Sequence, residues 1–412
     1  METSSVETTS STRSRPYLVG LMALLCIATF FEGYDFFIIS LIIDLLAEEF
    51  TVEISSVLNA VAFVNIGAIL GFFVIRLGDR IGRKPIVLAG VLGYASLSLA
   101  TAACPGLYSF MPIQFLAKMF LVTEFGMAIV IVTEEFPPKI RATSVAILEV
   151  AGALGGGAAM ISSKYVLPEW GWRGMYVIGG APLVLLPVMF FVIKETQHFQ
   201  TIRTTINEVR QPLWHIWTTA SRKFVALVGA IWFLCYLGYA GVVYHWVLFA
   251  KTERGWSETD VGLPMTLAAL VGMTGFIVSG AMMDTLGRKI TGIIFFLGSA
   301  GALVWAFTAS GPWMIPSVVA AMFFVFAILP ICSTYNAELF PTEIRANATA
   351  WCNFLLGRPA QVFAPLTVAQ LSAIMGGYGN AVAVLAVGPL IAALLVWRLL
   401  PETKGIKLDE VG

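Results

Sequence analysis

The sequence is poor in charged residues. Only 12% of its 412 residues are Asp, Glu, Lys or Arg, whereas a soluble domain carries about 25%. These charges are too few to cover a water-facing surface, so lipid must surround most of the chain. The formal net charge is zero, and the sequence contains no basic stretch of the kind that binds nucleic acid. We therefore expect a membrane protein without a nucleic-acid partner.

Cysteine and histidine are also scarce, with five Cys and three His in the whole chain. Four of the five cysteines fall inside apolar segments, so no disulfide framework is expected. Cys and His are not spaced as metal ligands, and no constellation of catalytic residues is visible. We expect neither a metal, a cofactor nor an enzymatic activity. The first sixteen residues are polar and lack the apolar core and cleavage site of a signal peptide.

Long apolar runs are abundant. The chain is 58% hydrophobic, and a membrane-spanning helix needs about 20 mostly apolar residues. The runs are continuous, without the alternating short segments of a membrane β-barrel. The sequence therefore predicts an all-α membrane protein with twelve transmembrane helices. The predicted spans are 17–43, 54–75, 85–103, 107–131, 142–166, 173–193, 224–250, 260–281, 290–309, 312–333, 347–373 and 379–400.

The distribution of positive charge predicts the orientation. If the N-terminus is inside, most of the 25 Lys and Arg residues fall on the cytosolic side, as the positive-inside rule requires. We expect both termini in the cytosol and the protein in the inner or plasma membrane. The longest polar stretch then joins two six-helix halves. The predicted divisions are a disordered tail at 1–16, a first half at 17–193, a linker at 194–223, a second half at 224–400 and a tail at 401–412.

Three short segments occur twice in the same order. Asp-Arg-Ile-Gly-Arg-Lys at 79–84 is matched by Asp-Thr-Leu-Gly-Arg-Lys at 284–289. A Glu followed by Ile-Arg-Ala recurs after spans four and ten, and Glu-Thr recurs after spans six and twelve. Such order argues for duplication of a six-span unit. Parallel repeats of this kind are a known transporter plan, with the substrate site between the halves near the middle of the membrane.

These segments resemble the major facilitator superfamily over nearly the whole chain. The loop pattern Gly-x-x-x-Asp-x-x-Gly-Arg-Lys is complete at 280–289, whereas Ile75 replaces the leading Gly of the first copy. Trp172-Arg173 and the Pro-Glu-Thr-Lys-Gly at 401–405 resemble the sugar-porter branch and its relatives. Those relatives include metabolite and aromatic acid:proton symporters and organic-ion transporters. The resemblance implies two pseudo-symmetric six-helix bundles and secondary transport by alternating access.

In that family the repeated loops have a structural role. Gly lets helices approach closely, and Asp can cap a helix or pair with Arg. We expect the loops and the acidic and basic residues that follow them to hold a cytosolic gate shut in the outward-facing state. The alternative is that their Arg and Lys only set the topology. The predicted gate residues are Asp79, Gly82, Arg83, Glu134, Arg141, Gly280, Asp284, Gly287, Arg288, Glu338 and Arg345.

Several acidic residues lie inside predicted spans, where a charge costs roughly 2.5–3.5 kcal/mol. Glu32 and Asp35 are three residues apart in span one and share a helix face. Glu-Gly-Tyr-Asp at 32–35 resembles the Asp-Gly-Tyr-Asp of aromatic-acid symporters, which implies that these acids couple transport to protons. A structural pair satisfied by neighbouring polar groups is the alternative. Glu124 in span four is the third predicted proton-coupling residue.

Span eleven carries Arg358, about eleven residues from its cytosolic end, or roughly 16 Å into the membrane. Organic-anion transporters of the superfamily have a similarly placed Arg, and a guanidinium matches a carboxylate. An internal ion pair with Glu32, Asp35 or Glu149 is the alternative. Lys118 in span four either binds substrate or pairs with Glu124 or a span-one acid.

Polar and aromatic residues near Arg358 complete the predicted binding site. Asn353 and Gln361 flank it in span eleven. Trp232, Tyr236 and Tyr239 lie on one face of span seven, where aromatic rings can stack on a ring-bearing substrate. Ordinary helix packing gives the same spacing.

The predicted function is proton-coupled uptake of a small organic carboxylate, with aromatic carboxylates included. A sugar or polyol porter is the first alternative, but the Gln and Asn clusters it requires are sparse in spans seven and eight. Efflux of drugs or metabolites is the second alternative, and the intramembrane cations Lys118 and Arg358 argue against a cationic cargo. We expect the partners to be the substrate, protons and the lipid bilayer, with the protein a monomer.

Overall fold

The computed structural model describes residues 13–197, 199–200, 213–340 and 342–404, and all regular secondary structure in this part is helical. The first half contains α1 (Arg15–Leu41), α2 (Ile43–Glu49), α3 (Ile54–Ile81), α4 (Arg83–Ala102), α5 (Leu107–Glu135), α6 (Pro138–Gly179), η1 (Ala181–Leu185) and α7 (Leu186–Val192). The second half contains η2 (Leu213–Thr218), α9 (Arg222–Arg254), α10 (Glu258–Leu286), α11 (Arg288–Thr308), η3 (Gly311–Trp313), α12 (Met314–Glu338), α13 (Thr342–Thr349), η4 (Ala350–Gly357), α14 (Pro359–Met375), α15 (Tyr378–Val384) and α16 (Val387–Leu399).

Ten helices of the described part are long and apolar enough to cross a membrane. The difference from twelve has two local causes. The helical stretch that contains α6 and α7 holds two spans, because the chain turns at Gly171. The span that ends in α14 is interrupted by the π-helical η4, so it contains no single qualifying helix. The predicted all-α membrane fold is confirmed.

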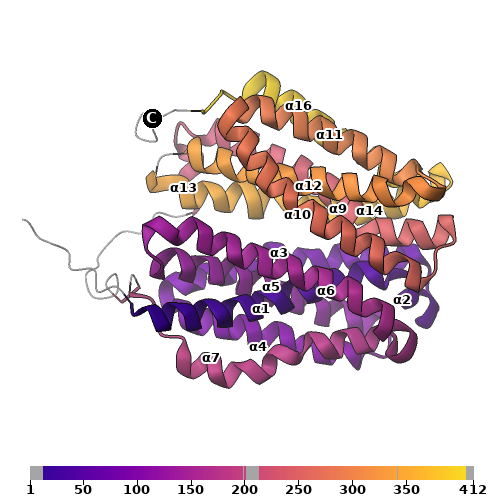
Figure 1. Cartoon of the computed structure of the whole chain (residues 1–412), viewed down its shortest axis with the longest axis horizontal. Helices are drawn as coiled ribbons and strands as arrows, with labels where there is room; N and C mark the ends of the chain where they lie inside the picture. The colour runs from indigo at the N-terminus through magenta and orange to yellow at the C-terminus, as the bar shows by residue number, and fades with distance from the viewer. Residues whose placement is uncertain (1–12, 198, 201–212, 341, 405–412) are drawn as a thin grey trace, which may run out of the picture.

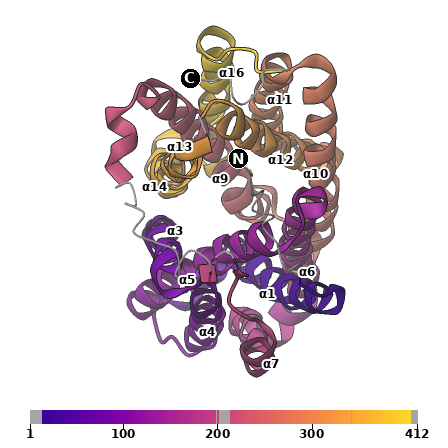
Figure 2. The ribbon, with the colours of Figure 1, turned by 90° about the vertical axis from the view of Figure 1, so that its left-hand side faces the viewer.

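The helices form two bundles that lie side by side (Figure 1). The start of α1 and the end of α16 lie at one end of the molecule, which we call the terminal face, and α2 lies at the other end, which we call the opposite face. Figure 2 looks onto the terminal face and shows the helices of each half grouped together. The halves meet where α3 packs along α14 and α6 packs along α10.

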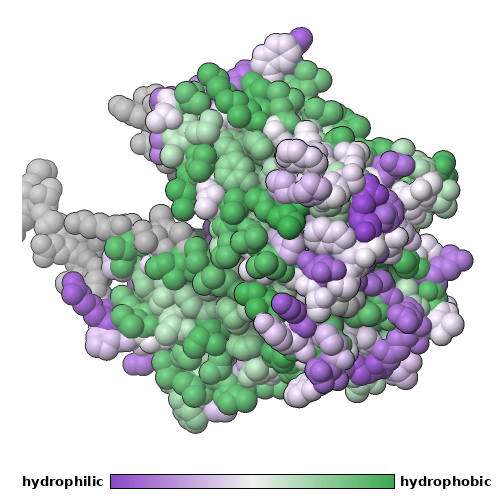
Figure 3. Space-filling view, turned by 45° about the vertical axis from the view of Figure 1, so that its right-hand side comes forward, coloured by the Kyte–Doolittle hydropathy of each residue, from purple (hydrophilic) through white to green (hydrophobic). Residues whose placement is uncertain are grey.

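The flank of the molecule is apolar. Large side chains such as Phe191, Ile277 and Ile374 are about three-quarters or more exposed, at 80%, 74% and 80%. Figure 3 shows hydrophobic side chains covering the flank and hydrophilic ones gathered towards the opposite face. A soluble protein rarely exposes an apolar surface of this extent, whereas lipid tails cover it without cost.

A close crossing of α1 and α6 fixes the helix that carries the two predicted acids. A Cβ at Gly155 would lie 1.7 Å from the carbonyl oxygen of Phe30, so a larger side chain cannot be accommodated there. Small residues allow membrane helices to approach at backbone distance. The crossing lies within one turn of Glu32 and therefore holds this part of α1 firmly within the first half.

An ion pair and a close helix contact between the halves lie towards the opposite face. Lys251 Nζ at the end of α9 lies 2.7 Å from Asp44 Oδ2 of α2. A Cβ at Gly262 of α10 would lie 3.2 Å from the Met160 carbonyl oxygen of α6. An ion pair and a close helix contact thus join the two halves at this end.

Candidate functional site

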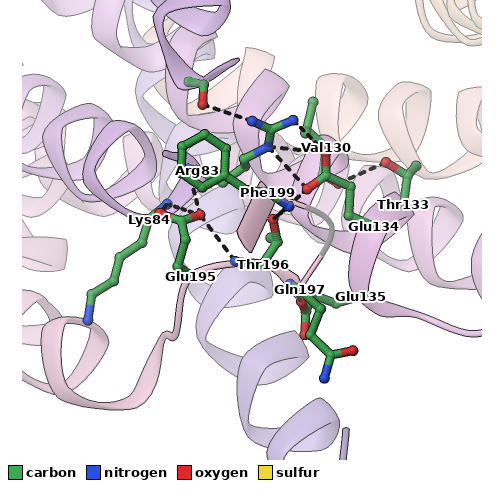
Figure 4. A network of polar contacts seen from close by, with 11 residues as sticks. Arg83, Lys84, Val130, Thr133, Glu134, Glu135, Glu195, Thr196, Gln197 and Phe199 are labelled. Atoms are coloured by element: carbon green, nitrogen blue, oxygen red, sulfur yellow. Dashed lines mark hydrogen bonds and ion pairs between the residues drawn. The ribbon is translucent and has the colours of Figure 1, made fainter. Parts of the chain in front are cut away.

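The first repeated loop builds a polar cluster at the terminal face (Figure 4). The Arg83 guanidinium donates to both carboxylate oxygens of Glu134, with the shortest contact at 2.8 Å, and to the Gly78 carbonyl oxygen at 2.9 Å. The Thr196 hydroxyl donates to the same Glu134 carboxylate at 2.6 Å. The cluster therefore ties α4 to α5 and to the chain that follows α7.

The second repeated loop builds the same cluster in the other half. The Arg288 guanidinium donates to Glu338 at 2.7–3.1 Å and to the Met283 carbonyl oxygen at 3.0 Å. The Thr403 hydroxyl donates to Glu338. Equivalent atoms thus make equivalent bonds in the two halves, which supports duplication at the level of single hydrogen bonds.

A glycine and a distant glutamate complete each cluster. Gly82 and Gly287 have φ angles of 112° and 94°, which residues with a side chain rarely adopt. The next helix begins directly afterwards. Its first N–H groups point at a carboxylate: Arg83 N donates to Glu195 at 2.8 Å, and Arg288 N donates to Glu402 at 2.9 Å.

The carboxylates of Glu195 and Glu402 therefore lie at the N-termini of α4 and α11, where a negative charge is stabilised. Burial opposes ionisation of Glu402, but backbone N–H donors, with Arg288 first among them, hold its pKa below the ordinary carboxylate value. The contribution of Glu402 to stability is therefore complete above the ordinary carboxylate pKa and is lost as the pH falls through the lower pKa of the folded protein.

Five predicted gate residues remain, and the two of them whose surroundings the structure describes, Gly280 and Asp284, are less closely engaged. The side chains of Asp79, Arg141 and Arg345 lie outside the described part of the structure. The Asp284 side chain is 80% exposed and lies 3.5 Å from Arg288. Gly280 has open space where a Cβ would stand, because α6 and α10 meet nearer the opposite face. The expected close helix contact is therefore not made at Gly280 in this structure.

Asp35 lies where three helices meet. It is 5% exposed, and its Oδ1 lies 2.8 Å from the Ser98 hydroxyl of α4. That hydroxyl also lies 2.9 Å from the Tyr176 carbonyl oxygen of α6. A hydroxyl has one proton and donates to one of these acceptors at a time. The geometry accommodates Asp35 as a carboxylate that accepts from Ser98, or as an acid that donates to it.

Glu32 is partly exposed. It is within charge-interaction range of Lys118, Arg358 and Asp35. Glu124 is in a different environment. It is fully buried, and neither of its carboxyl oxygens has a well-formed hydrogen bond within the described residues. Glu124 interacts electrostatically with Glu32 and not with Lys118. The Lys118–Glu124 ion pair that the sequence allowed is therefore not formed.

Lys118 is covered by an aromatic ring. Its Nζ lies 3.5 Å from the centroid of the Phe36 ring, and the side chain is only 6% exposed. No carboxylate of the described residues comes within 4.0 Å of this ammonium group. Lys118 is therefore held as a cation–π pair instead of an ion pair.

Arg358 follows directly after a π-helical segment. Arg358 N donates to the Asn353 carbonyl oxygen five residues earlier, at 2.9 Å, and π-helical turns are frequent at functional sites. The guanidinium lies 4.8 Å from the Phe354 ring centroid. Among the residues that the structure describes, its Nε has no hydrogen-bond partner and no carboxylate lies within ion-pair distance. The internal ion pair with Glu32, Asp35 or Glu149 is thus absent among the residues described.

The three predicted aromatic residues of α9 gather beside Arg358. The rings of Trp232 and Tyr236 are 5.3 Å apart, and those of Tyr236 and Tyr239 are 6.1 Å apart. The Tyr236 hydroxyl donates to Asn353 Oδ1 at 2.8 Å. All three aromatic side chains are at least 91% buried. They pack against one another, and their role towards a substrate stays a prediction.

A polar contact between the halves was not anticipated from the sequence. Asn65 Nδ2 of α3 donates to the Gln361 carbonyl oxygen at 2.9 Å, and Asn65 Oδ1 accepts from the Tyr244 hydroxyl at 3.3 Å. Gln361 has a free carbonyl because Pro365, four residues later, lacks the N–H that would bond to it. Asn65 is the one polar residue in the apolar run at 60–75, and that was the available signal.

Comparison with known proteins agrees with this architecture. The sequence profile of the Major Facilitator Superfamily matches residues 25–365 and, overlapping them, 248–409. The chain belongs to the major facilitator superfamily. A member of this superfamily is a secondary transporter and not an enzyme, so the coarse functional prediction is confirmed.

Other members of the superfamily resemble the chain over most of its length. A niacin transporter of Acinetobacter baylyi is 24% identical, and the match covers 93% of each chain. A cis,cis-muconate transport protein of the same organism is also 24% identical, with 86% of this chain and 87% of the relative covered. The structure of the Escherichia coli xylose transporter matches with a TM-score of 0.78 at 19% identity, covering 96% of this chain and 99% of that one. That structural match establishes the major facilitator fold.

Proposed function

We propose that the chain carries a small organic carboxylate across the membrane together with protons. The observation that carries this proposal is the state of Arg358. Its guanidinium lies between the halves, is partly exposed and has no carboxylate partner among the described residues. Its Nε is buried without a hydrogen-bond partner among the described residues, which is costly for a polar group, and the planar fork of Arg fits a carboxylate. A substrate anion would supply the missing partner.

Protons enter through the acids of α1. Asp35 and Glu32 lie within charge-interaction range of Lys118, and Glu32 also interacts with Arg358. Loss of the negative charge on Glu32 would remove a charge that competes at longer range with a substrate carboxylate for Arg358. The Ser98 hydroxyl can turn between Asp35 and the Tyr176 carbonyl oxygen. It can therefore donate to Asp35 when Asp35 is ionised and accept from Asp35 when Asp35 is protonated. Glu124, which has no well-formed partner, is a further place for a proton within the first half.

Alternating access follows from how the halves touch. Asp44–Lys251 and Asn65–Gln361 join them towards the opposite face, whereas each described Arg–Glu cluster of the terminal face lies within one half. The distribution of Lys and Arg favours a cytosolic terminal face, and with that orientation we assign this arrangement to the inward-facing state. The Asp79, Arg83 and Glu134 loop and its repeat would then close the cytosolic gate when the halves rock.

The relatives support a carboxylate substrate. Niacin and cis,cis-muconate both carry carboxylate groups, and transporters of both match the chain over more than four-fifths of its length. A sugar has no carboxylate, so it would leave Arg358 without a partner.

The proposal is tested by transport into proteoliposomes. We expect nicotinate to accumulate when the outside is more acidic than the lumen, above the level reached in protein-free vesicles. Nicotinamide, which shares the ring but lacks the carboxylate, should not respond to the gradient. Nicotinate uptake through the protein that ignores an imposed pH difference would contradict proton coupling. Equal uptake of the amide would contradict the carboxylate site.

A further inference from the structure

The two membrane cations differ in how far they are accessible. Arg358 is partly exposed, whereas Lys118 is 6% exposed beneath the face of the Phe36 ring. The Phe36 ring lies 6.3 Å from the Tyr244 ring of α9, at an angle of 30°. Phe36 therefore stands between α5 of the first half and α9 of the second, with Lys118 behind it.

The two cations lie close enough to repel each other, with Glu32 interacting with both. A substrate with two carboxylates would thus find a cation for each if both were accessible. A ring placed 3.5 Å from the ammonium group covers one side from which a carboxylate oxygen could approach it. Because Lys118 is only 6% exposed, the more accessible of these two cations is Arg358.

We propose that Phe36 is a specificity-determining residue, which restricts the site to monocarboxylates by covering Lys118. The proposal rests on the carboxylate site proposed above and adds the number of carboxylates that the site accepts. The cation–π contact with Phe36 stabilises the positive charge of Lys118 in place of a second carboxylate. Removal of the ring uncovers Lys118 and lets the site bind a dicarboxylate.

The test compares the binding of nicotinate with that of pyridine-3,5-dicarboxylate, which has the same ring and one more carboxylate. The wild-type protein should favour nicotinate. Phe36→Ala should raise the affinity for the dicarboxylate relative to nicotinate by roughly tenfold, or about 1.4 kcal/mol. Phe36→Leu keeps an apolar side chain between the helices and should give a smaller gain in the same direction. If the Phe36→Ala variant does not fold, the Phe36→Leu variant still tests the proposal.

The double variant Phe36→Ala/Lys118→Met identifies the source of any gain. The gain in dicarboxylate affinity must disappear when the ammonium group is removed. A gain that survives in the double variant would overturn the proposal, as would an equal change in affinity for both ligands in Phe36→Ala and Phe36→Leu. If the wild-type protein bound nicotinate and nicotinamide equally, the proposed carboxylate site itself would be contradicted. This outcome concerns the wild-type protein, so it can be told apart from the two outcomes in the Phe36 variants.

Discussion

Replacement of Arg358 with alanine is expected to remove most of the affinity for nicotinate. Loss of one partner from a desolvated charge pair costs about 2–5 kcal/mol, so the dissociation constant should rise roughly 30-fold or more. Arg358→Lys keeps the charge but not the fork, and it should lie between wild type and Arg358→Ala. A binding titration on the purified protein measures all three affinities.

Arg398→Ala is the matched control, because Arg398 is exposed at the end of α16 and stacks on Trp397 at 4.4 Å. It should bind nicotinate as the wild-type protein does. The affinity for nicotinamide should be weak in every variant and should not depend on Arg358. Wild-type nicotinate affinity in Arg358→Ala would show that another group holds the carboxylate.

Replacement of Asp35 with asparagine is expected to separate substrate movement from proton movement. Asn has the shape of Asp and can still accept the Ser98 hydroxyl, but it cannot load a proton. For one coupled proton, a pH difference of one unit supports about tenfold accumulation. In Asp35→Asn this ratio should fall to about one, while exchange of nicotinate between equal pools continues.

Glu48→Gln provides the comparison, because Glu48 is exposed near the opposite face and lies outside the proposed site. It should accumulate nicotinate normally. Nicotinate accumulation in Glu32→Gln tests whether Glu32, the other acid of α1, carries the proton instead of Asp35. Full accumulation in both Asp35→Asn and Glu32→Gln would end the assignment of coupling to these acids.

Features that repeat along the chain were predictable. The loops at 79–84 and 284–289 appeared twice in the sequence, and the structure gives their Arg residues equivalent partners in Glu134 and Glu338. The positions of the spans followed from apolar length alone. The turn at Gly171 and the π-helical η4 are local changes of backbone that composition does not specify.

Contacts between distant segments were not predictable. The capping of a helix by Glu195 joins residues more than a hundred positions apart, and Asn65 meets Gln361 across the two halves. The free carbonyl at Gln361 follows from Pro365, but its partner depends on how α3 packs on α14. Side-chain pairing also depends on helix face. Lys118 and Glu124 are six residues apart and point in different directions, so they do not meet.

The central claim is that a carboxylate and a proton move together. It is tested most directly by recording the lumenal pH of proteoliposomes when nicotinate is added outside without a pre-formed pH gradient. The lumen should acidify faster than in protein-free vesicles, nicotinamide should produce no change, and Arg358→Ala should lose the response. Entry of nicotinate through the wild-type protein with no acidification would contradict the mechanism.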